Sequence, residues 1–502
     1  MREYEVALNQ NSLVKYLRKP AIEFTRHDII RYIEENEIEQ VNFHYVNEDG
    51  KLKTLNFVIT SRAYLESILS TGERVDGSSL FSYIDASTSD LYVIPRFKTA
   101  FVNPFSEVPT IDLFCSFYTK EGEPLASAPE NILRNAGRRF TKATGYKIKA
   151  LGELEYYIIA DKDINKDYPA DDQKGYHEAT PFAKFEFIRT EAIRTLAQCG
   201  GKIKYAHSEV GSFTTEDKYY EQHEIEFNPV DVDETADQIV LGKWILRNIA
   251  FKYGVDISFA PKITVGKAGS GLHIHYMVVD EHDNNLMIEN DKLSPVALKS
   301  IAGILDKAKA LTAFGNSIPT SYLRLVPHQE APTNICWGVT NRSALVRIPL
   351  GWTLKTEMIK DANPLEIAKV PYIPGKQTAE FRVPDGSADL YHLLAGMVMA
   401  MQHGIEMDNG LEVAEKLKIE VNLFENEELI NSLQQLPTSC FDSANELEKE
   451  ISFFNQNNTF PIGTLERFVN HLKSYDDKDL SERLYQKDDE IMELVNKFIH
   501  YA

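Results

Sequence analysis

Two glutamates separated by one residue are the first candidates for chemistry in this chain. Glu153 and Glu155 lie in an apolar and aromatic stretch, residues 152–159. The two-residue period of a β-strand puts both carboxylates on one face and Leu154 on the other. An isolated pair of this kind usually belongs to a solvated strand face. Here the apolar neighbours favour burial, and two buried like charges need a cation to stay ionised.

Two histidines repeat this geometry farther along the chain. His273 and His275 are one residue apart on a second strand pattern, and a glycine-rich segment, residues 269–271, precedes them. A lone histidine is usually a hydrogen-bonded core residue, but a pair on one strand face favours a ligand role for one of the two. Carboxylate oxygens with a single imidazole nitrogen suit Mg²⁺ or Mn²⁺ better than zinc.

Two further acidic residues, Glu209 and Glu224, lie in short strand-like patterns. Each is a weak signal alone, and the polar segment 211–220 between them is predicted to be a loop. Glu153, Glu155, Glu224 and His273 together predict a cluster of carboxylates and imidazole that holds divalent metal ions.

Four arginines lie in apolar strands or tight turns: Arg324, Arg342, Arg347 and Arg382. An unpaired guanidinium is unfavourable in such surroundings, so each needs an anion. For any one of them, a buried salt bridge to a protein carboxylate is the better explanation. Four of them beside a metal cluster indicate recognition of phosphate and carboxylate groups.

Composition limits the classes of partner. The chain has 502 residues, 43% of them hydrophobic, which is enough for a large core and roughly two to four domains. With 54 basic and 75 acidic residues, its formal charge of −21 excludes nucleic acid and anionic membrane as expected partners. The apolar run 393–401 is too short to span a bilayer. Four widely spaced cysteines predict reduced core thiols, and a cytoplasmic location is expected.

The chain divides into two predicted domains, residues 21–118 and 119–502, at a polar loop near residues 118–129. In the first, a helix is predicted over 26–38, with strands over 40–44, 54–59 and 91–94. The second begins with a helix over 131–144 and then mixes strands (146–159, 223–227, 271–279, 344–348) with helices (185–198, 236–253). From about residue 410 it is mostly helical, over 425–436, 443–454 and 481–500. These patterns predict an α+β fold.

Taken in order, the motifs resemble those of glutamine synthetases, especially the bacterial class I enzymes, from about Asp76 to Tyr391. Val-Asp-Gly-Ser-Ser at 75–79 resembles the family's ammonium-site loop, and Ser-Asp-Leu at 89–91 follows at the expected distance. The resemblance implies a small N-terminal β-grasp domain followed by a large catalytic α+β domain with a curved antiparallel sheet.

The resemblance also implies roles for individual residues. The implied ligands of a first metal ion are Glu155, Glu209 and Glu224, and those of a second are Glu153, His273 and Glu380. The implied ATP-binding residues are Arg342, Arg347, His275 and Trp337. The implied glutamate-binding residues are Gly269, Arg324, Arg382 and Glu155. The implied catalytic residues are Asp76, Glu330 and Arg347.

The implied reaction is the ATP-dependent ligation of ammonia to L-glutamate through γ-glutamyl phosphate. A carboxylate is a poor electrophile, so ATP must first convert it to an acyl phosphate, and two or more Mg²⁺ or Mn²⁺ ions with arginines stabilise that transfer. Ammonium must then lose a proton, for which Asp76 is the expected base. Glu330 is expected to exclude water from the intermediate.

The resemblance implies an assembly as well: a homo-oligomer, expected to be a dodecamer of stacked rings. In such rings Asp76 reaches the catalytic domain of a neighbouring subunit, so each active site lies between subunits.

Some positions depart from the family pattern. An insertion within 211–220 lengthens the spacing between Glu209 and Glu224, Ala268 replaces the usual asparagine, and Thr378 stands where an arginine often assists the phosphates. Two alternatives therefore stay open: a γ-glutamyl ligase that uses an amine or polyamine, and a non-catalytic relative, which the complete set of metal ligands disfavours. Ring number, metal preference and regulation also stay open.

Overall fold

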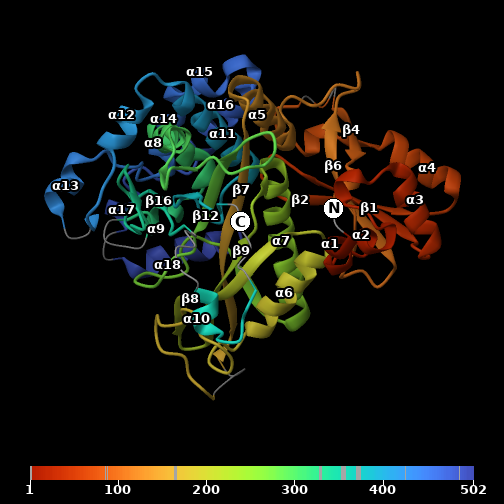
Figure 1. The fold of residues 1–502 in the computed structure, drawn as a ribbon, viewed down its shortest axis with the longest axis horizontal. Helices are drawn as coiled ribbons and strands as arrows, with labels where there is room; N and C mark the ends of the chain where they lie inside the picture. The colour runs from red at the N-terminus through yellow and green to blue at the C-terminus, as the bar shows by residue number, and fades with distance from the viewer. Residues whose placement is uncertain are drawn as a thin grey trace.

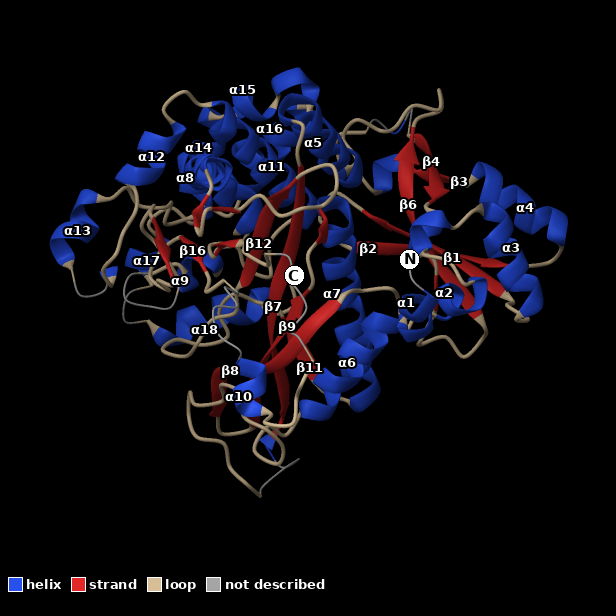
Figure 2. Cartoon of the chain, in the orientation of Figure 1, coloured by secondary structure: helices blue, strands red, loops and turns tan. Residues whose placement is uncertain are grey.

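The computed structural model describes residues 3–84, 86, 89–162, 167–326, 331–351, 358–368, 375–423, 426–484 and 487–501. An N-terminal domain stands beside a larger domain, as Figure 1 and Figure 2 show. The first contains a six-stranded sheet and the second is built around a nine-stranded sheet. The expected α+β class, with a small β-grasp domain followed by a large catalytic domain, is confirmed.

The N-terminal sheet has the order β2-β1-β6-β4-β3, with β5 paired to β6. Its strands are β1 (Gln40–Val46), β2 (Leu52–Val58), β3 (Glu73–Asp76), β4 (Asp90–Pro95), β5 (Phe101–Val102) and β6 (Thr110–Tyr118). Strands β1 and β6 run parallel, while the other pairs are antiparallel. The helices of this domain are α1 (Glu3–Leu8), α2 (Ser12–Leu17), η1 (Ala21–Glu23), α3 (Arg26–Glu35), α4 (Arg62–Thr71), η2 (Gly77–Ser79) and η4 (Phe97–Thr99). A capping box of Thr25 and Asp28 starts α3.

The sheet of the larger domain has the order β15-β16-β17-β12-β7-β9-β8, and β10 and β11 also pair with β7. Its strands are β7 (Lys147–Asp161), β8 (Ile203–Thr214), β9 (Lys218–Phe227), β10 (Val230–Asp231), β11 (Asp256–Ser258), β12 (Leu272–Val279), β15 (Trp337–Val339), β16 (Val346–Ile348) and β17 (Ala379–Phe381); β13 (Ile288–Glu289) and β14 (Lys292–Leu293) form a separate hairpin. All pairs are antiparallel except β15 with β16.

Helices cover one face of this sheet. They are α5 (Pro129–Thr144), α6 (Glu186–Gln198), α7 (Val232–Tyr253), α8 (Pro295–Gly315) and α11 (Leu390–Glu406); the short α9 (Ser321–Arg324) and α10 (Met358–Ala362) lie in connections. Gly152 approaches α7 so closely that a Cβ atom would lie 2.7 Å from Ile239 Cδ1, and Leu154 is buried in the same core. By strand alternation, Glu153 and Glu155 therefore point to the opposite face.

The C-terminal part is helical, as expected. Its helices are α12 (Gly410–Lys416), α13 (Glu427–Ser432), α14 (Cys440–Lys449), α15 (Ile451–Phe454), η7 (Gln456–Asn458), α16 (Ile462–Lys473), α17 (Leu480–Arg483) and α18 (Asp488–Phe498). All four cysteines are buried and free, which confirms the prediction of core thiols. Among the described residues, no helix is long and apolar enough to cross a membrane.

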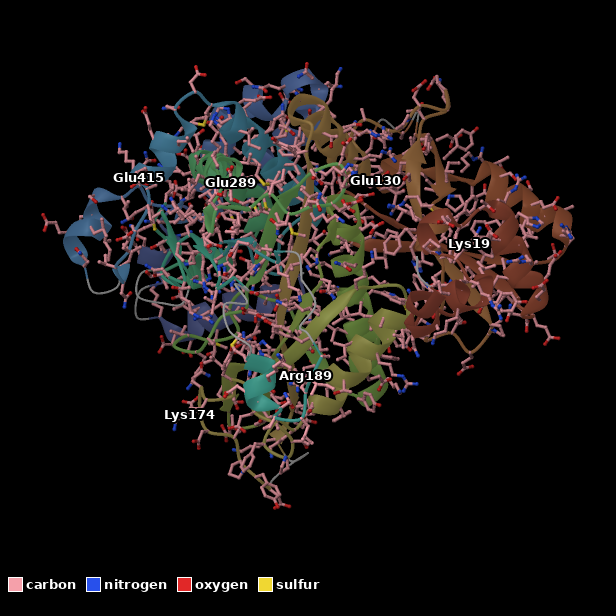
Figure 3. The ribbon with its side chains drawn as sticks, in the orientation of Figure 1. Lys19, Glu130, Lys174, Arg189, Glu289 and Glu415 are labelled. Carbon is pink, nitrogen blue, oxygen red and sulfur yellow. The ribbon has the colours of Figure 1, made fainter. Side chains whose placement is uncertain are left out.

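Buried polar contacts join the two domains. The Arg96 guanidinium donates to both oxygens of Asp237, at 2.7 and 3.0 Å, and Tyr391 Oη donates to the same carboxylate at 2.6 Å. Glu130, at the start of α5, accepts a hydrogen bond from the Phe117 N–H at 2.9 Å; Figure 3 labels it, together with Lys19 in the N-terminal domain. These contacts fix the β-grasp domain against the helices that support the large sheet.

The prediction of a loop over 211–220 is wrong. Strands β8 and β9 continue through most of this segment, and only residues 215–217 separate them. Phe213 and Tyr220 stack across the hairpin with ring centroids 4.4 Å apart, and Phe213 also packs on Tyr157. An irregularity in the pairing between Ser208 and Ser212 breaks the two-residue period, which hides the strand in the sequence.

Candidate active site

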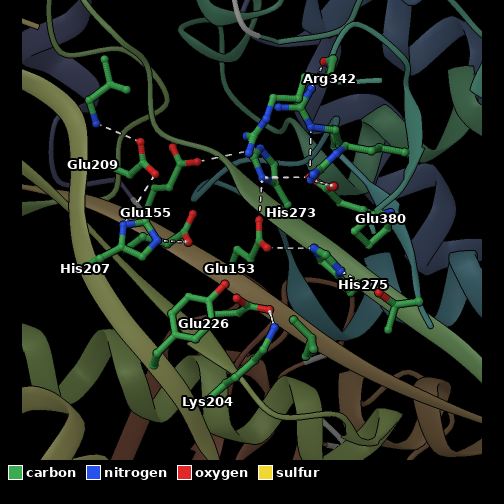
Figure 4. Close-up of a pocket in the computed structure, with 18 of the residues that line it drawn as sticks. Glu153, Glu155, Lys204, His207, Glu209, Glu226, His273, His275, Arg342 and Glu380 are labelled. Carbon is green, nitrogen blue, oxygen red and sulfur yellow. Dashed lines mark hydrogen bonds and ion pairs between the residues drawn. The ribbon is translucent and has the colours of Figure 1, made fainter. Parts of the chain in front are cut away.

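A cavity of about 1430 Å³ opens on the face of the large sheet opposite α7. Strands β7, β8, β9, β12 and β17 supply its floor, and the connections around Arg324, Arg342 and Lys376 contribute to its walls. Figure 4 shows acidic, imidazole and arginine side chains converging in it. Almost every site residue predicted from the sequence within the described part of the chain lines this one cavity.

The first ligand group is Glu153, His273 and Glu380. Glu153 and His273 are direct partners across β7 and β12, and His275 faces Glu380 across β12 and β17. His273 Nδ1 lies 3.0 Å from Glu153 Oε2 and 3.5 Å from Glu380 Oε1. One ligand atom from each residue lies within 4.8 Å of the others, a spacing that a single metal ion can bridge.

The second ligand group is His207, Glu209 and Glu224, with ligand atoms again within 4.8 Å of one another. His207 Nε2 lies 3.1 Å from Glu224 Oε1, and Nδ1 lies 3.8 Å from Glu209 Oε1. The family resemblance assigns Glu155, not His207, to this group. His207 is two residues before Glu209, so strand alternation is the signal that could have found it.

Glu155 lies beside this second group. It is the direct partner of Glu224 across β7 and β9. Its Oε2 atom accepts hydrogen bonds from the Gly271 N–H at 2.7 Å and from Gln222 Nε2 at 3.3 Å. These donors fix one carboxylate oxygen on the side of the cavity nearest the glycine-rich segment 269–271.

The electrostatics of the second group fit a divalent cation. Burial, together with the negative charges of Glu153, Glu155 and Glu209, raises the pKa of Glu224 well above its usual range. Converging carboxylates without compensating charge are unfavourable, and a bound Mg²⁺ or Mn²⁺ would remove that repulsion. The donor set, oxygen-rich with one imidazole per group, therefore suits the metals expected from the sequence.

Two histidines compensate the negative charge of Glu153 in the first group. Burial opposes ionisation of Glu153, but the charges of His275 and His273 and their hydrogen bonds lower the pKa of Glu153 well below its usual value. Burial likewise lowers the pKa of His275, but the nearby Glu153 outweighs it, so the net shift is upward. His275 Nε2 lies 2.9 Å from Glu153 Oε1, and Nδ1 lies 3.0 Å from Thr378 Oγ1.

The four arginines all line the cavity. Arg347 Nη1 donates to Glu380 Oε2 at 2.7 Å, and Arg382 Nε donates to Glu380 Oε1 at 3.0 Å. Arg324 donates to the Val383 and Arg382 carbonyls at 2.8 and 3.2 Å. Arg347 and Arg382 thus share one protein carboxylate, and that carboxylate belongs to a ligand group.

The glycine-rich segment packs tightly against these groups. A Cβ atom on Gly269 would lie 2.5 Å from the Pro261 carbonyl and 3.1 Å from Arg324 Cγ. The Gly269 carbonyl accepts from Gln222 Nε2 at 2.9 Å, and the Ala268 carbonyl accepts from Tyr157 Oη at 2.9 Å. Only a glycine fits here without moving the backbone or Arg324.

A second network supports the strands from behind. Arg189, labelled in Figure 3, donates to Ser208 Oγ at 2.8 Å and to His223 Nδ1 at 2.9 Å. His223 Nε2 lies 2.8 Å from Glu221 Oε1. Ser208 and His223 alternate with the ligands of the second group, so this network holds β8 and β9 in register from the opposite face.

Two of the predicted residues do not line the cavity, and a third, Glu330, lies outside the described residues. Asp76 is exposed in the N-terminal domain, where its carboxylate accepts hydrogen bonds from Ser78 and Ser79, and these bonds lower its pKa. Trp337 is buried, and its Nε1 donates to the Ala414 carbonyl at 2.6 Å. Its indole is not part of the cavity lining formed by the described residues, and its role in binding ATP stays a prediction.

Comparison with known proteins identifies relatives of both domains. The model described as "Glutamine synthetase, catalytic domain" matches residues 126–490, and "Glutamine synthetase, beta-Grasp domain" matches residues 37–120. Glutamine synthetase of Thermotoga maritima is 30% identical over 434 residues, covering 84% of this chain and 90% of that protein. The enzyme of Clostridium saccharobutylicum is 29% identical over 434 residues, covering 85% and 90%.

Solved structures share the fold. A cryo-EM structure of Plasmodium falciparum glutamine synthetase has a TM-score of 0.73 at 21% identity, covering 93% of this chain and 97% of that one. A structure described as apo GmaS without ligand has a TM-score of 0.70 at 18% identity, covering 90% and 96%.

A β-grasp domain joined to a curved, mostly antiparallel sheet that carries two carboxylate and imidazole groups defines a ligase of the glutamine synthetase type. With the catalytic-domain match extending over most of its length, the chain belongs to the glutamine synthetase family.

Proposed function

We propose that this protein ligates ammonia to L-glutamate at the expense of ATP, through γ-glutamyl phosphate, giving L-glutamine, ADP and phosphate. The observation that carries the proposal is the placement of both ligand groups and four arginines in one cavity. Phosphoryl transfer to a carboxylate needs cations around the moving group, and this cavity supplies them. Curated relatives that are similar over most of their length are glutamine synthetases.

In this proposal, Glu153, His273 and Glu380 hold one divalent ion. Glu209 and Glu224 hold another, with Glu155 and His207 placed to complete its ligands. When bound, such ions neutralise charge on the phosphates and polarise the transferred group.

The arginines would divide between the two substrates. Arg342 and Arg347 face the phosphates of ATP, while Arg382 and Arg324, the latter beside Gly269, hold the carboxylates of glutamate. The close contact of Gly269 with Arg324 supports this arrangement, because it fixes the guanidinium stem at one end of the cavity. His275, bound to Thr378, orients Glu153 on the nucleotide side.

Proton removal from ammonium is assigned to Asp76 of a neighbouring subunit. Its exposure supports this role, since a carboxylate on the surface of one chain can reach a cavity in another, and the hydrogen bonds from Ser78 and Ser79 keep it ionised, the state that attracts ammonium. Glu330 is proposed to close the site. The dodecamer of stacked rings and the cytoplasmic location also stay predictions.

A second candidate function is the ligation of an amine or polyamine to glutamate. It is motivated by residues near Gly269 that differ from the family pattern. Ala268 replaces an asparagine, and the β8–β9 hairpin extends beside it, with Lys267 Nζ 5.8 Å from the centre of the Phe213 ring. These changes alter the wall of the cavity nearest Gly269.

A panel of acceptors separates the two functions. ADP formation is measured with glutamate and Mg²⁺, using ammonium, methylamine or putrescine as the acceptor, and Glu153→Gln is the inactive control. The proposal predicts glutamate-dependent turnover with ammonium at the highest kcat/KM. Turnover with putrescine but not ammonium would select the second function, and absence of turnover with every acceptor would contradict both.

A further inference from the structure

A buried carboxylate next to the ligand groups has no part in the proposed ligation. Glu226 lies on β9, two residues beyond Glu224 on the same face, and is the direct partner of Glu153 across β7 and β9. It is only 2% exposed. Figure 4 shows it among the residues that line the cavity. It belongs to neither ligand group found among the described residues.

The two oxygens of Glu226 differ in their surroundings. Oε1 lies 2.6 Å from Lys204 Nζ. Oε2 is buried and receives no hydrogen bond from the residues that the structure describes. A buried anionic oxygen without a donor is unfavourable, so this atom is placed to accept a hydrogen bond from a bound molecule.

Lys204 screens the carboxylate from the open cavity. Its side chain is 44% exposed, and its ammonium lies 4.9 Å from the centre of the Tyr205 ring. The Tyr205 phenol lies beside the same carboxylate. The half-exposed lysine can move when a ligand enters, whereas the carboxylate is fixed by the sheet.

The position of Glu226 indicates which part of a bound nucleotide would lie next to its carboxylate. Beyond it, on the side away from Gly269, the cavity lining includes Met277, Pro349 and Leu350, whose apolar groups can pack on a flat base, together with the ion pair of Lys149 and Asp283. A strand rises roughly 3.3 Å per residue, so Glu226 lies about 7 Å along β9 from Glu224. The group between a base and a metal-bound phosphate chain is the sugar, which offers neighbouring hydroxyls as donors.

We propose that Glu226 binds the ribose hydroxyls of the nucleotide, with Lys204 as its displaceable partner, and so selects ribonucleotides over deoxyribonucleotides. This inference rests on the proposed function, because it requires ATP in the same cavity. A carboxylate accepts hydrogen bonds from a vicinal diol, an interaction that carboxylates also make with ribose in dinucleotide-binding folds.

Calorimetric binding of ADP, 2′-deoxyADP and 3′-deoxyADP with Mg²⁺ tests the proposal without turnover. Wild-type protein is expected to bind ADP about 10- to 100-fold more tightly than at least one deoxy analogue, the effect of a hydrogen bond to a charged group. In Glu226→Ala, ADP binding should weaken to the affinity of that analogue, while the analogue's own affinity stays within about twofold. Lys204→Ala should keep the discrimination.

Controls keep the outcome interpretable. Glu281→Ala, at an exposed position outside the cavity, should bind all three nucleotides as wild type does. Glu226→Gln keeps one acceptor oxygen, so it should retain part of the discrimination if the alanine variant folds poorly. Equal weakening of all three nucleotides in Glu226→Ala, or a changed Mg²⁺ requirement with intact discrimination, would overturn the inference alone. Wild-type protein that binds no ADP would overturn the proposed function as well.

Discussion

Glu153 and His273 are direct partners across strands β7 and β12, and their side chains meet with Oε2 3.0 Å from Nδ1. The pairing register alone therefore places a carboxylate and an imidazole at one point on the sheet. Because β17 joins the other edge of β12, Glu380 reaches the same point. A metal-binding group thus arises from three strands that are far apart in the sequence.

Glu153→Gln should weaken Mn²⁺ binding, since the amide offers one neutral oxygen in place of an anionic pair. We expect at least a tenfold loss of affinity by calorimetry and about a hundredfold or larger loss of glutamate-dependent turnover. The exposed Glu281→Gln variant is the matched control. Unchanged Mn²⁺ affinity in Glu153→Gln would remove this residue from the metal site.

Glu224→Gln should raise the Tm of the protein without metal and lower it, relative to wild type, with metal. Burial and four neighbouring carboxylates raise the pKa of Glu224, and an acid whose pKa is higher in the folded state destabilises that state above its unfolded-state pKa. In chelator at pH 7.5, the variant should melt a few degrees higher than wild type. With saturating Mn²⁺ the order should reverse, because wild type gains more binding energy. A lower Tm of the variant than of wild type in chelator would contradict the claim that Glu224 destabilises the metal-free protein.

Gly211→Ala should damage the glutamate end of the cavity. The new Cβ atom would overlap Tyr157 Oη and lie 2.6 Å from Gln222 Oε1, and Gln222 holds the Gly269 carbonyl. We expect a destabilisation of about 1–3 kcal/mol and a raised KM for glutamate with little change for ATP. Gly463→Ala is the control, because its Cβ would meet open space. Equal changes in both KM values would count against this local effect.

Lys243 should make stability depend on alkaline pH. Burial, reinforced by Arg247, lowers the pKa of Lys243 to about 7, from 10.5. Between these values the unfolded chain binds more protons, so folding becomes more favourable as pH rises. The gain is on the order of 1 kcal/mol per pH unit. Lys243→Met lacks this gain. The Tm of wild type should therefore rise relative to the Tm of the variant between pH 7.5 and pH 9.5. Parallel pH curves would contradict this assignment.

Mixing two inactive variants tests whether sites lie between subunits. Asp76→Ala removes the proposed base and Glu153→Gln a ligand, so each homogeneous oligomer should be inactive. Co-expressed chains should regain a fraction of activity, since some sites would pair an intact β-grasp domain with an intact cavity. Absence of any recovery in demonstrably mixed oligomers would place both residues in sites of a single chain.

Much of the cavity could be predicted from the sequence because strand alternation is a local property. Glu153, Glu155 and the two histidines of β12 could be assigned to one face from their spacing alone. Their meeting with Glu380 could not, since it depends on the register of β12 with β17. The family resemblance supplied that ligand, and it also supplied the β-grasp domain.

The second ligand group shows where local patterns fail. The irregularity between Ser208 and Ser212 breaks the period of β8, so the sequence predicts a loop in place of the hairpin and gives His207 no role. The arginines show a different limit. Their apolar surroundings predict an anionic partner, but only the structure shows that Arg347 and Arg382 share Glu380.

Joining ammonia to glutamate through ATP is the central activity proposed for this cavity. The most direct test supplies nitrogen-15-labelled ammonium with glutamate, ATP and Mg²⁺ and measures both products, glutamine by mass spectrometry and ADP by chromatography. We expect one labelled glutamine for each ADP, with neither product formed when glutamate is omitted or in Glu153→Gln. ADP formation without labelled glutamine, or no reaction in the wild-type protein, would contradict the proposal.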